Sequence, residues 1–465
     1  MKWYNIDMLT FKPFEKSDIA DVRPYLDGIE PVCTKAIGVK YMWAEYSGTE
    51  IARYDGGILV KDRMFGEELF AVPRGERREE GLRLIEEYVR NSGGELIFNS
   101  VDDDELAFLA SRYPAIEPKT NRDYADYLYL AEDMRLFKGK KYHGQRNHIN
   151  RFLHDYPNYV FSRFGKEDLP RIYAFLEEHK ALAPRSKEEL TEYACCVRLL
   201  NAFDELDLCA AKIEVEGKIV AISVGEIFHD TLIIHIEKAL PAYSGVYPTM
   251  CNLFAREFSE GLLYINREDD AGDAGLRISK TQYHPVHMVD KRLVFCRVAR
   301  RFTFPTLFTE RLALDDFTPA DMPAYAALAT DEERNVYWGY DYKVDLGSDA
   351  PDAAHFARVL AEDEGRGVCY SRKIADTSGR FVGEAVLYNF RLDGSAELGL
   401  RIASAEKGKG YGREMYRAVA DAVLPIFGTL HARCFKANDP SRKMILAAGF
   451  TLVREDDVFY YFKRK

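Results

Sequence analysis

A glycine-rich run near the C-terminus has the residue types and spacing of an anion-binding loop. It reads Lys407-Gly408-Lys409-Gly410-Tyr411-Gly412, and apolar residues at an α-helical period follow it from Tyr411 to Val423. Glycines before a helix N-terminus let free backbone N–H groups approach an anion, and the helix dipole favours negative charge there. The run matches neither GxxxxGK[ST] nor GxGxxG, so alone it indicates a pyrophosphate site or an ordinary strand-to-helix turn.

Charged residues gather at two further places in the first 300 residues. A basic run occupies residues 138–151 of an otherwise acidic chain, and residues 265–277 end a strand with clustered charges and glycines. The basic run fits either a ligand-binding segment or a solvated helix face. The second cluster fits either a binding site or an internal salt-bridge network that braces a loop. Neither its carboxylates nor the histidines have metal-ligand spacing, so no metal site is predicted.

One short pattern recurs along the chain and indicates how these residues are positioned. A Phe is followed four residues later by an Asp, after a strand-like stretch and before a helical one, and the copies lie 150 and 153 residues apart. The Asp suits the first helical turn, where its charge meets free N–H groups. Three matches at nearly equal spacing predict a repeated domain of about 150 residues. The pairs are Phe14 and Asp18, Phe164 and Asp168, and Phe317 and Asp321.

The interior of each repeat predicts an α+β fold. A glycine-containing turn between β-branched and aromatic runs marks a hairpin at residues 54–58, 215–219 and 376–381. We expect each repeat to form a mixed, mainly antiparallel sheet flanked by helices. The predicted domains are residues 1–135, 136–303 and 304–465, with a linker at 300–305.

Composition limits the classes of protein that this chain can be. Its 465 residues suit about three domains, and its formal charge of −11 argues against a general polyanion binder. Eight cysteines without disulfide or zinc spacing fit reduced thiols in a cytoplasmic protein. No signal peptide and no apolar run of about 18 residues is present, so we expect neither secretion nor a membrane span.

The third repeat resembles the GNAT acyltransferases, particularly the ribosomal-protein-type branch that acetylates protein N-termini and small amines. The resemblance covers about 155 residues. It rests on the order of a hairpin, a strand, the glycine-rich loop, a helix and a strand ending at Asn438, followed by Ser441 and Gly449-Phe450. The fold class that it implies for the whole chain is three tandem GNAT-like domains.

The GNAT resemblance implies acetyl-CoA as cofactor and a set of site residues. Glu397 is the preferred general base, with Glu384 as its rival, and Ser441 matches a serine that protonates the leaving thiolate. The tyrosine that many members use four positions further on is Ile445 here, and Glu397 also fits an exposed strand residue. The cofactor-binding residues implied are Leu400, Ile402, Lys407, Gly408, Lys409, Gly410, Tyr411, Gly412, Arg413 and Asn438.

The first two repeats have lost the glycine-rich loop. The second keeps one glycine, Gly245, beside Pro248, which has no N–H to offer. Residues 5–297 instead resemble the soluble domain of phosphatidylglycerol lysyltransferases and their cytosolic (DUF2156-like) relatives, which transfer an aminoacyl group from aminoacyl-tRNA. The resemblance implies a second transfer site with these residues: Lys141, Arg146, Asn150, Glu237, Asn266, Arg267, Asp269, Asp270 and Lys280.

Three functions are therefore open. The first is a CoA-dependent N-acetyltransferase that acts on a small-molecule or peptide amine through the third domain. The second is an aminoacyl-tRNA-dependent aminoacyltransferase acting on a lipid, peptide or small-molecule amine or hydroxyl. The third is a non-catalytic scaffold built from GNAT-like units. Affinity for CoA or for charged tRNA discriminates among them.

Overall fold

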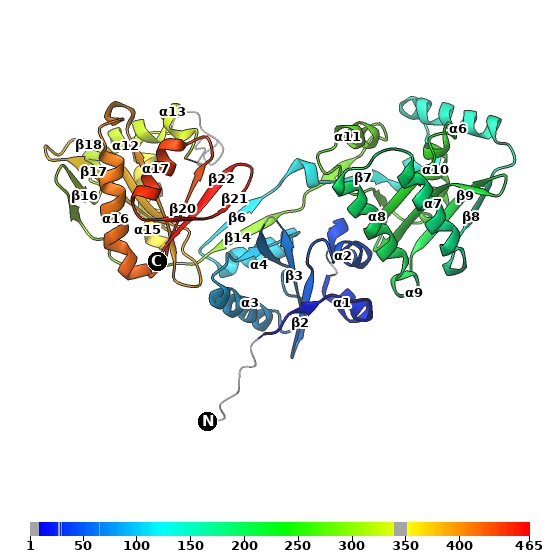
Figure 1. Ribbon diagram of the computed structural model, residues 1–465, viewed down its shortest axis with the longest axis horizontal. Coiled ribbons are helices and arrows are strands. Elements are labelled where there is room, and N and C mark those ends of the chain that lie inside the picture. Colours follow the sequence, from blue (N-terminus) through cyan, green and yellow to red (C-terminus); the bar gives the residue numbers. More distant parts are fainter. Residues whose placement is uncertain (1–8, 27, 29, 65, 339–350) are drawn as a thin grey trace, which may run out of the picture. The chain divides into compact units, whose positions relative to one another are not determined.

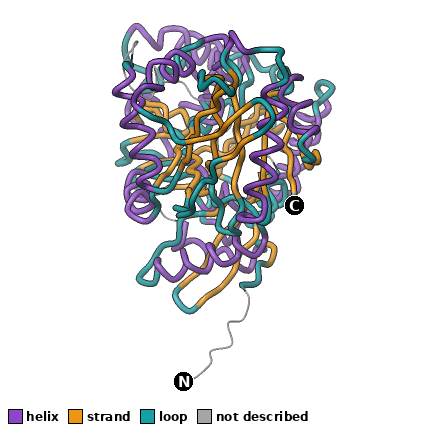
Figure 2. The backbone as a smooth tube through the Cα atoms, turned by 90° about the vertical axis from the view of Figure 1, so that its left-hand side faces the viewer, coloured by secondary structure: helices purple, strands orange, loops and turns teal. Residues whose placement is uncertain are grey.

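The computed structural model describes residues 9–338 and 351–465, apart from positions 27, 29 and 65. These residues form two compact units. The first comprises Met1–Ile85, Ile97–Leu106 and Pro118–Val294, and the second comprises Glu86–Leu96, Ala107–Glu117 and Phe295–Lys465. Three sheets with flanking helices account for the fold, as Figures 1 and 2 show. The prediction of an α+β chain of three GNAT-like domains is confirmed.

The first sheet has the order β1-β2-β3-β4-β5-β14-β6. Its strands are β1 (Lys12–Pro13), β2 (Glu50–Tyr54), β3 (Gly57–Met64), β4 (Glu67–Phe70), β5 (Ile97–Phe98), β14 (Leu293–Arg297) and β6 (Ala115–Lys119). The helices of this repeat are α1 (Ile19–Leu26), α2 (Ile37–Trp43), α3 (Arg78–Ser92) and α4 (Asp103–Arg112).

The second sheet has the order β13-β7-β12-β11-β10-β9-β8. Its strands are β13 (His287–Val289), β7 (Asp126–Leu130), β12 (Tyr264–Asn266), β11 (Thr231–Ala239), β10 (Lys218–Phe228), β9 (Cys209–Val215) and β8 (Val160–Arg163). The helices are α5 (Ala131–Leu136), α6 (His143–Asp155), α7 (Leu169–Ala181), α8 (Lys187–Leu200), α9 (Phe203–Leu206), α10 (Val246–Phe258) and α11 (Ala274–Thr281).

The third sheet has the order β15-β16-β17-β18-β19-β20-β22-β21. Its strands are β15 (Leu307–Phe308), β16 (Leu312–Asp315), β17 (Cys369–Asp376), β18 (Phe381–Tyr388), β19 (Ala396–Ile402), β20 (Leu430–Phe435), β22 (Phe459–Arg464) and β21 (Thr451–Glu455). The helices are α12 (Met322–Ala329), α13 (Glu332–Asn335), α15 (Ala353–Arg366), α16 (Tyr411–Phe427) and α17 (Asp439–Ala447).

The repeated Phe–Asp pattern has the same structure in all three copies. Each Asp ends a short 3₁₀ helix directly before α1, α7 or α12. Each Asp also forms an ion pair with a lysine. The distances are 2.8 Å for Lys12 and Asp18, 2.5 Å for Lys212 and Asp168, and 2.9 Å for Lys373 and Asp321. The predicted helix start is therefore confirmed, and the charge pairing explains why the Asp recurs. The three predicted hairpins are likewise present, as β2–β3, β9–β10 and β17–β18.

The first two repeats exchange a strand. Strand β7 belongs to the first predicted domain in sequence but lies between β13 and β12 in the second sheet, whereas β14 belongs to the second predicted domain but lies between β5 and β6 in the first sheet. The predicted boundary at residue 135 follows the sequence repeat, but each sheet is completed by a strand from beyond it. The first two repeats are therefore one interdependent pair.

The segment predicted as a linker packs against the third domain. Phe302 contacts Tyr370 and Phe427 at ring-centroid distances of 4.5 and 5.0 Å, and Phe304 is buried in the same core. The backbone N–H of Arg300 donates to the carbonyl of Gly367 at 2.9 Å. Residues 300–304 are thus part of the second unit and not a free connection.

The described residues contain no helix long and apolar enough to cross a membrane. All eight cysteines are free thiols, and seven of them are buried.

Candidate functional site

The glycine-rich loop leaves the N-terminus of α16 open. Gly408 and Gly410 both have φ of 82°, a left-handed conformation that side chains rarely adopt. Gly410 is the N-cap residue, and no side chain caps the helix. The free N–H groups of the first turn and the dipole of this 17-residue helix are therefore available to an anion. The loop has the structure that its sequence predicts.

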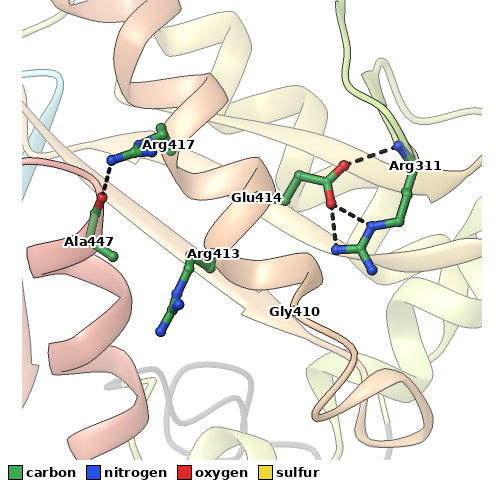
Figure 3. A pocket seen from close by; sticks show the side chains of 6 residues that line it. All are labelled: Arg311, Gly410, Arg413, Glu414, Arg417 and Ala447. Carbon is green, nitrogen blue, oxygen red and sulfur yellow. Dashed lines mark hydrogen bonds and ion pairs between the residues drawn. The ribbon is translucent and has the colours of Figure 1, made fainter.

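Three arginines surround this helix end. Arg311, Arg413 and Arg417 line a cavity of about 580 Å³ together with Gly410, Glu414 and Ala447. Glu414 holds Arg311 in an ion pair at 2.6 Å, and Arg417 donates to the carbonyl of Ala447 at 2.8 Å (Figure 3). Arg413, which was predicted, forms none of the interactions drawn there and is exposed. Sequence reasoning missed Arg311 and Arg417, although Arg417 follows Arg413 by one helical turn.

Strands β19 and β20 part beside this cavity. Their parallel ladder contains only Ala396 with Leu430 and Glu397 with His431, whereas β19 continues to Ile402. Leu400 and Ile402 therefore lie beyond the last pair. A Cβ built on Gly412 would lie 3.5 Å from the Ile402 side chain and 3.8 Å from that of Leu400. The loop, the start of α16 and the unpaired end of β19 thus lie close together.

Asn438 and Ser441 lie at the start of α17. The Asn438 side chain caps this helix and accepts from the Ser441 N–H at 3.3 Å. Both residues are half-buried. Lys407 and Lys409, which were predicted to bind the cofactor, both pair with carboxylates in the structure. Lys409 is 2.8 Å from Glu406, and Lys407 is 3.7 Å from Glu333.

Glu384 lies in a buried polar cluster on the opposite face of the sheet from α16. It pairs across the strands with Arg401, whose guanidinium it binds through Oε1. Its Oε2 is buried and has no hydrogen-bond partner among the described residues. Arg401 in turn donates to Asn335 at 2.5 Å and lies 4.7 Å from the Trp338 ring. Tyr325 faces the same carboxylate, and burial together with the charge of Glu384 raises the pKa of Tyr325 well above its usual range.

Glu397 lies on the same sheet face, with both oxygens occupied. Oε1 accepts from the Tyr388 hydroxyl at 2.7 Å and lies 3.1 Å from Arg433, while Oε2 accepts from Asn389 at 2.9 Å. Burial alone would raise its pKa, but the Arg433 charge and the two hydrogen bonds together lower it. Its side chain is 3% exposed, so the alternative of an exposed strand residue does not hold.

In the first unit, the charged cluster at 265–277 is a network around the end of β12. Arg267 binds Glu237 at 2.6 Å, and both are largely buried. Lys280 donates to the carbonyls of Arg267 and Asp269. Burial and the Arg267 charge lower the pKa of Lys280. The structure therefore brings together these predicted residues: Glu237, Asn266, Arg267, Asp269, Asp270 and Lys280.

Three residues of this network, Asn266, Asp269 and Asp270, make contacts that hold neighbouring segments of the protein together. Asn266 donates to the Pro31 carbonyl at 2.7 Å and to Asp126 at 3.0 Å. Asp269 pairs with Lys291 at 2.6 Å. Asp270 is fully buried and accepts from Arg277 at 2.8 Å. By contrast, two buried nitrogens of Arg267 and Oε1 of Glu237 have no hydrogen-bond partner among the described residues.

The other three predicted residues lie apart from that cluster, on or just before α6. Lys141 pairs with Asp133 at 2.7 Å. Arg146 donates to the carbonyls of Phe137 and Gly139 and so braces the turn before α6. Asn150 is exposed. These residues therefore belong to a surface helix and not to the Glu237–Arg267 cluster.

Helix α6 covers the helix end that would hold a pyrophosphate in the second repeat. Gly245 is the N-cap residue of α10, as Gly410 is of α16. A Cβ built on Gly245 would lie 2.1 Å from the His148 carbonyl oxygen and 3.2 Å from the Phe152 side chain, both on α6. An anion has no comparable access there. The sequence predicts that this repeat lacks a CoA loop, and in the structure α6 also blocks the corresponding helix end.

A buried histidine cluster was not predicted as a site. His235 lies between Glu226 at 3.1 Å and Glu268 at 2.9 Å, and its side chain is fully buried. Burial alone would lower its pKa, but the hydrogen bonds and charges of the two carboxylates raise it to about 9. Sequence reasoning gave His235 no role because no second histidine lies at a metal-ligand spacing from it. Among the described residues there is no group of three or more side chains placed to hold a metal ion.

Comparison with known proteins found two family models that match separate parts of the chain. The family described as phosphatidylglycerol lysyltransferase, C-terminal, matches residues 31–295, and the acetyltransferase (GNAT) domain family matches residues 311–451. A search among curated proteins found no match.

Solved structures that are similar to parts of this chain were also found. A conserved protein of unknown function from Bacteroides thetaiotaomicron is 27% identical with a TM-score of 0.58, over 62% of this chain and all of its own. The C-terminal domain of a putative lysylphosphatidylglycerol synthetase from Agrobacterium fabrum is 15% identical with a TM-score of 0.40, over 55% and 85%. An acetyltransferase from Agrobacterium tumefaciens is 26% identical with a TM-score of 0.29, over 36% and 99%.

Proposed function

We propose that this chain, which belongs to the phosphatidylglycerol lysyltransferase C-terminal family over residues 31–295, is a two-module acyltransferase whose GNAT domain transfers an acetyl group from acetyl-CoA to a primary amine. Both matched families are acyltransferases, so the protein is a transferase. The observation that carries the proposal is the open N-terminus of α16 beside the parted strands β19 and β20. We place the reaction in the cytoplasm, with a peptide or small-molecule amine as acceptor.

The residues present fit CoA in their chemistry. The N–H groups of α16 and the side chain of Arg413 suit the phosphates, and the edge of β19 at Leu400 and Ile402 suits the amide groups of pantetheine. Acetyl-CoA would supply an activated thioester. Glu384 would accept the proton that the amine loses as the C–N bond forms, and Ser441 would donate a proton to sulfur as the C–S bond breaks.

Calorimetric titration of acetyl-CoA and CoA into the full chain tests the cofactor site. In Gly410→Asp the new carboxylate caps α16 and repels a pyrophosphate, while the Cβ lies 3.4 Å from Arg311, close but without a severe clash. We expect micromolar binding to the natural chain and a loss of at least about ten-fold in the variant.

Gly428→Asn is the matched control, because Gly428 is also left-handed, with φ of 66°, and lies at the other end of α16, where an added Cβ would have no atom within 4 Å. The control should bind CoA as the natural chain does. Absence of binding to the natural chain, or equal binding by Gly410→Asp, would refute the cofactor site.

A second function is supported for the first unit. Because α6 covers the N-terminus of α10, a donor other than CoA is needed there. We propose an aminoacyl-tRNA donor, in keeping with the lysyltransferase family, and acceptor chemistry at Glu237 and Arg267. Transfer of radiolabelled lysine from lysyl-tRNA to a lipid or amine acceptor measures it. Glu237→Gln should lower that transfer, and failure of the natural chain to consume any charged tRNA would exclude it.

A further inference from the structure

The two basic residues that flank Glu384 in the third sheet are already bound to carboxylates. Lys373 of β17 and Arg401 of β19 are its register partners on the neighbouring strands. Arg401 binds Glu384 itself, and Lys373 lies 2.9 Å from Asp321. Both basic side chains are largely buried. An acceptor with a negative charge beside its amine would therefore have to compete with these carboxylates for a counter-charge.

The same sheet face continues past an aromatic ring to a second carboxylate. Glu397 lies 3.1 Å from Arg433; burial would raise its pKa, but the Arg433 charge and two hydrogen bonds lower it, so Glu397 is ionised. Gly399 lies between the two carboxylates in the strand register, and a Cβ built on it would lie 3.2 Å from the Trp338 side chain. Aromatic ring faces carry partial negative charge and attract cations rather than anions. This face therefore disfavours an acceptor whose amine stands next to a free carboxylate.

A carboxylate base also favours an amine that loses its proton easily. Only the uncharged amine has a lone pair that can attack a thioester, and carboxylates are weak bases. An α-amine has an ordinary pKa of about 8, whereas an alkylamine such as the lysine side chain has one of about 10.4. At about pH 7.5 the uncharged fraction of an α-amine is therefore roughly 200-fold larger. The acceptor that fits this face is an α-amine whose carboxyl group is bound in an ester or an amide.

We propose that the GNAT domain acetylates the α-amine of an aminoacyl ester and so consumes the product of an aminoacyl transfer. The inference rests on the two reactions proposed above. Transfer of an aminoacyl group from tRNA to a hydroxyl gives a new ester with a free α-amine. The nitrogen then bonds to the acetyl carbon as the C–S bond breaks, Glu384 takes the amine proton and Ser441 protonates the sulfur. Exchange with solvent restores both side chains, and the products are an N-acetylaminoacyl ester and CoA.

A peptide N-terminus also offers an α-amine without a free carboxylate. The aminoacyl ester is favoured because the same chain carries the module whose proposed reaction makes it. The compact unit that contains the GNAT domain also includes Glu86–Leu96 and Ala107–Glu117, which belong to the first repeat. The two modules therefore share structural elements, and every copy of the acetyltransferase is made with the aminoacyltransferase. A peptide acceptor would not require an aminoacyltransferase in the same chain.

Acetyl transfer by the full chain to four small amines tests the proposal. The probes are alanine methyl ester, free alanine, alanyl-alanine amide and propylamine, and the released CoA thiol gives the rate. We expect kcat/KM for the ester to exceed that for each other amine at least about ten-fold. Glu397→Gln removes one negative charge from this face and should lower the ratio of ester to free alanine at least about three-fold. Asp421→Asn is the matched control, since Asp421 is an exposed residue of α16, on the other side of the sheet, and should leave the ratio unchanged.

Equal use of free alanine and its methyl ester would overturn the proposal, as would a preference for propylamine or an unchanged ratio in Glu397→Gln. A preference for alanyl-alanine amide would make a peptide N-terminus the acceptor instead. Lysyl-tRNA incubated with Glu237→Gln and acetyl-CoA should keep an unacetylated lysyl group, and its acetylation would overturn the order of the two reactions. Each of these results leaves the acetyl-CoA site standing. Absence of acetylation of every probe, despite CoA binding, would refute acetyl transfer itself together with this inference.

Discussion

At the scale of single residues, Glu384 and Glu397 differ in what their carboxylates can still do. Glu384 keeps one buried oxygen without a partner among the described residues, whereas both oxygens of Glu397 accept hydrogen bonds. We expect Glu384→Gln to lower the turnover number for acetyl transfer by about 100-fold or more with unchanged affinity for acetyl-CoA. Steady-state kinetics with calorimetry separates the two quantities.

Glu397→Gln provides the comparison. It leaves Arg433 without its carboxylate partner, so the main effect should be a lower melting temperature, by the equivalent of a few kcal/mol. A loss of turnover in Glu397→Gln at unchanged stability, with an active Glu384→Gln, would return the role of base to Glu397.

His235 gives a pH dependence at the same scale. Its folded-state pKa of about 9 lies above the ordinary value of about 6.5, so its stabilising contribution is complete below pH 6.5 and is lost as pH rises through 9. This difference in pKa corresponds to a contribution of about 3 kcal/mol. The melting temperature of the natural chain should fall over this interval, and His235→Gln should show a flatter profile. Parallel profiles would contradict the charged state of His235.

At the scale of elements, the contact between α6 and α10 predicts a strong glycine requirement. Gly245→Ala places a Cβ 2.1 Å from the His148 backbone oxygen, so α6 must move. Gly217→Ala has the same left-handed strain, with φ of 78° against 83°, but no atom within 4 Å. We expect Gly217→Ala to cost about 1 kcal/mol in the free energy of unfolding and Gly245→Ala about 2 kcal/mol more. Denaturant midpoints measure the difference between the two variants. An equal loss of unfolding free energy in both would show that α6 can move away from residue 245 without a measurable penalty.

The sequence predicts well those features that depend on neighbouring residues, and poorly those that join distant segments. The loop at 407–412 follows from consecutive glycines and a helical period, so its open helix end was predictable. Arg311, which directly precedes β16, reaches the same site from about a hundred residues away, and its pairing with Glu414 leaves no local signal in the sequence. The Glu226–His235–Glu268 cluster joins three separate segments of the second sheet and its adjoining loop, so it too was beyond spacing arguments.

At the scale of the whole molecule, the three repeats were predictable but their exchange of strands was not. Strands β7 and β14 are short and mostly apolar, with the sequences DYLYL and LVFCR, and nothing in such a run states which sheet a strand joins. The two compact units therefore do not coincide with sequence domains. The second unit contains Glu86–Leu96 and Ala107–Glu117, which lie about 200 residues before the rest of it.

Because residues 86–96 are part of the second unit, we expect a substitution at Glu95 to affect the stability of the GNAT domain. Glu95 pairs with Arg297 and Arg391, both at 2.7 Å, and these arginines are only 10% and 14% exposed. Burial alone would raise the pKa of Glu95, but the two arginines lower it to about 2. Glu95→Ala leaves both guanidinium groups buried without this carboxylate, which should cost about 3–5 kcal/mol.

The loss should appear in the GNAT domain although residue 95 lies in the first repeat. Hydrogen exchange followed by mass spectrometry should show faster exchange in β18, β19 and β20. Glu117→Ala is the matched control, because Glu117 binds the same Arg297 at 3.3 Å but is 47% exposed, so its loss should cost no more than about 1 kcal/mol. If the amides of these strands exchanged no faster in Glu95→Ala than in Glu117→Ala, the stability of the GNAT domain would not depend on the Glu95 ion pairs.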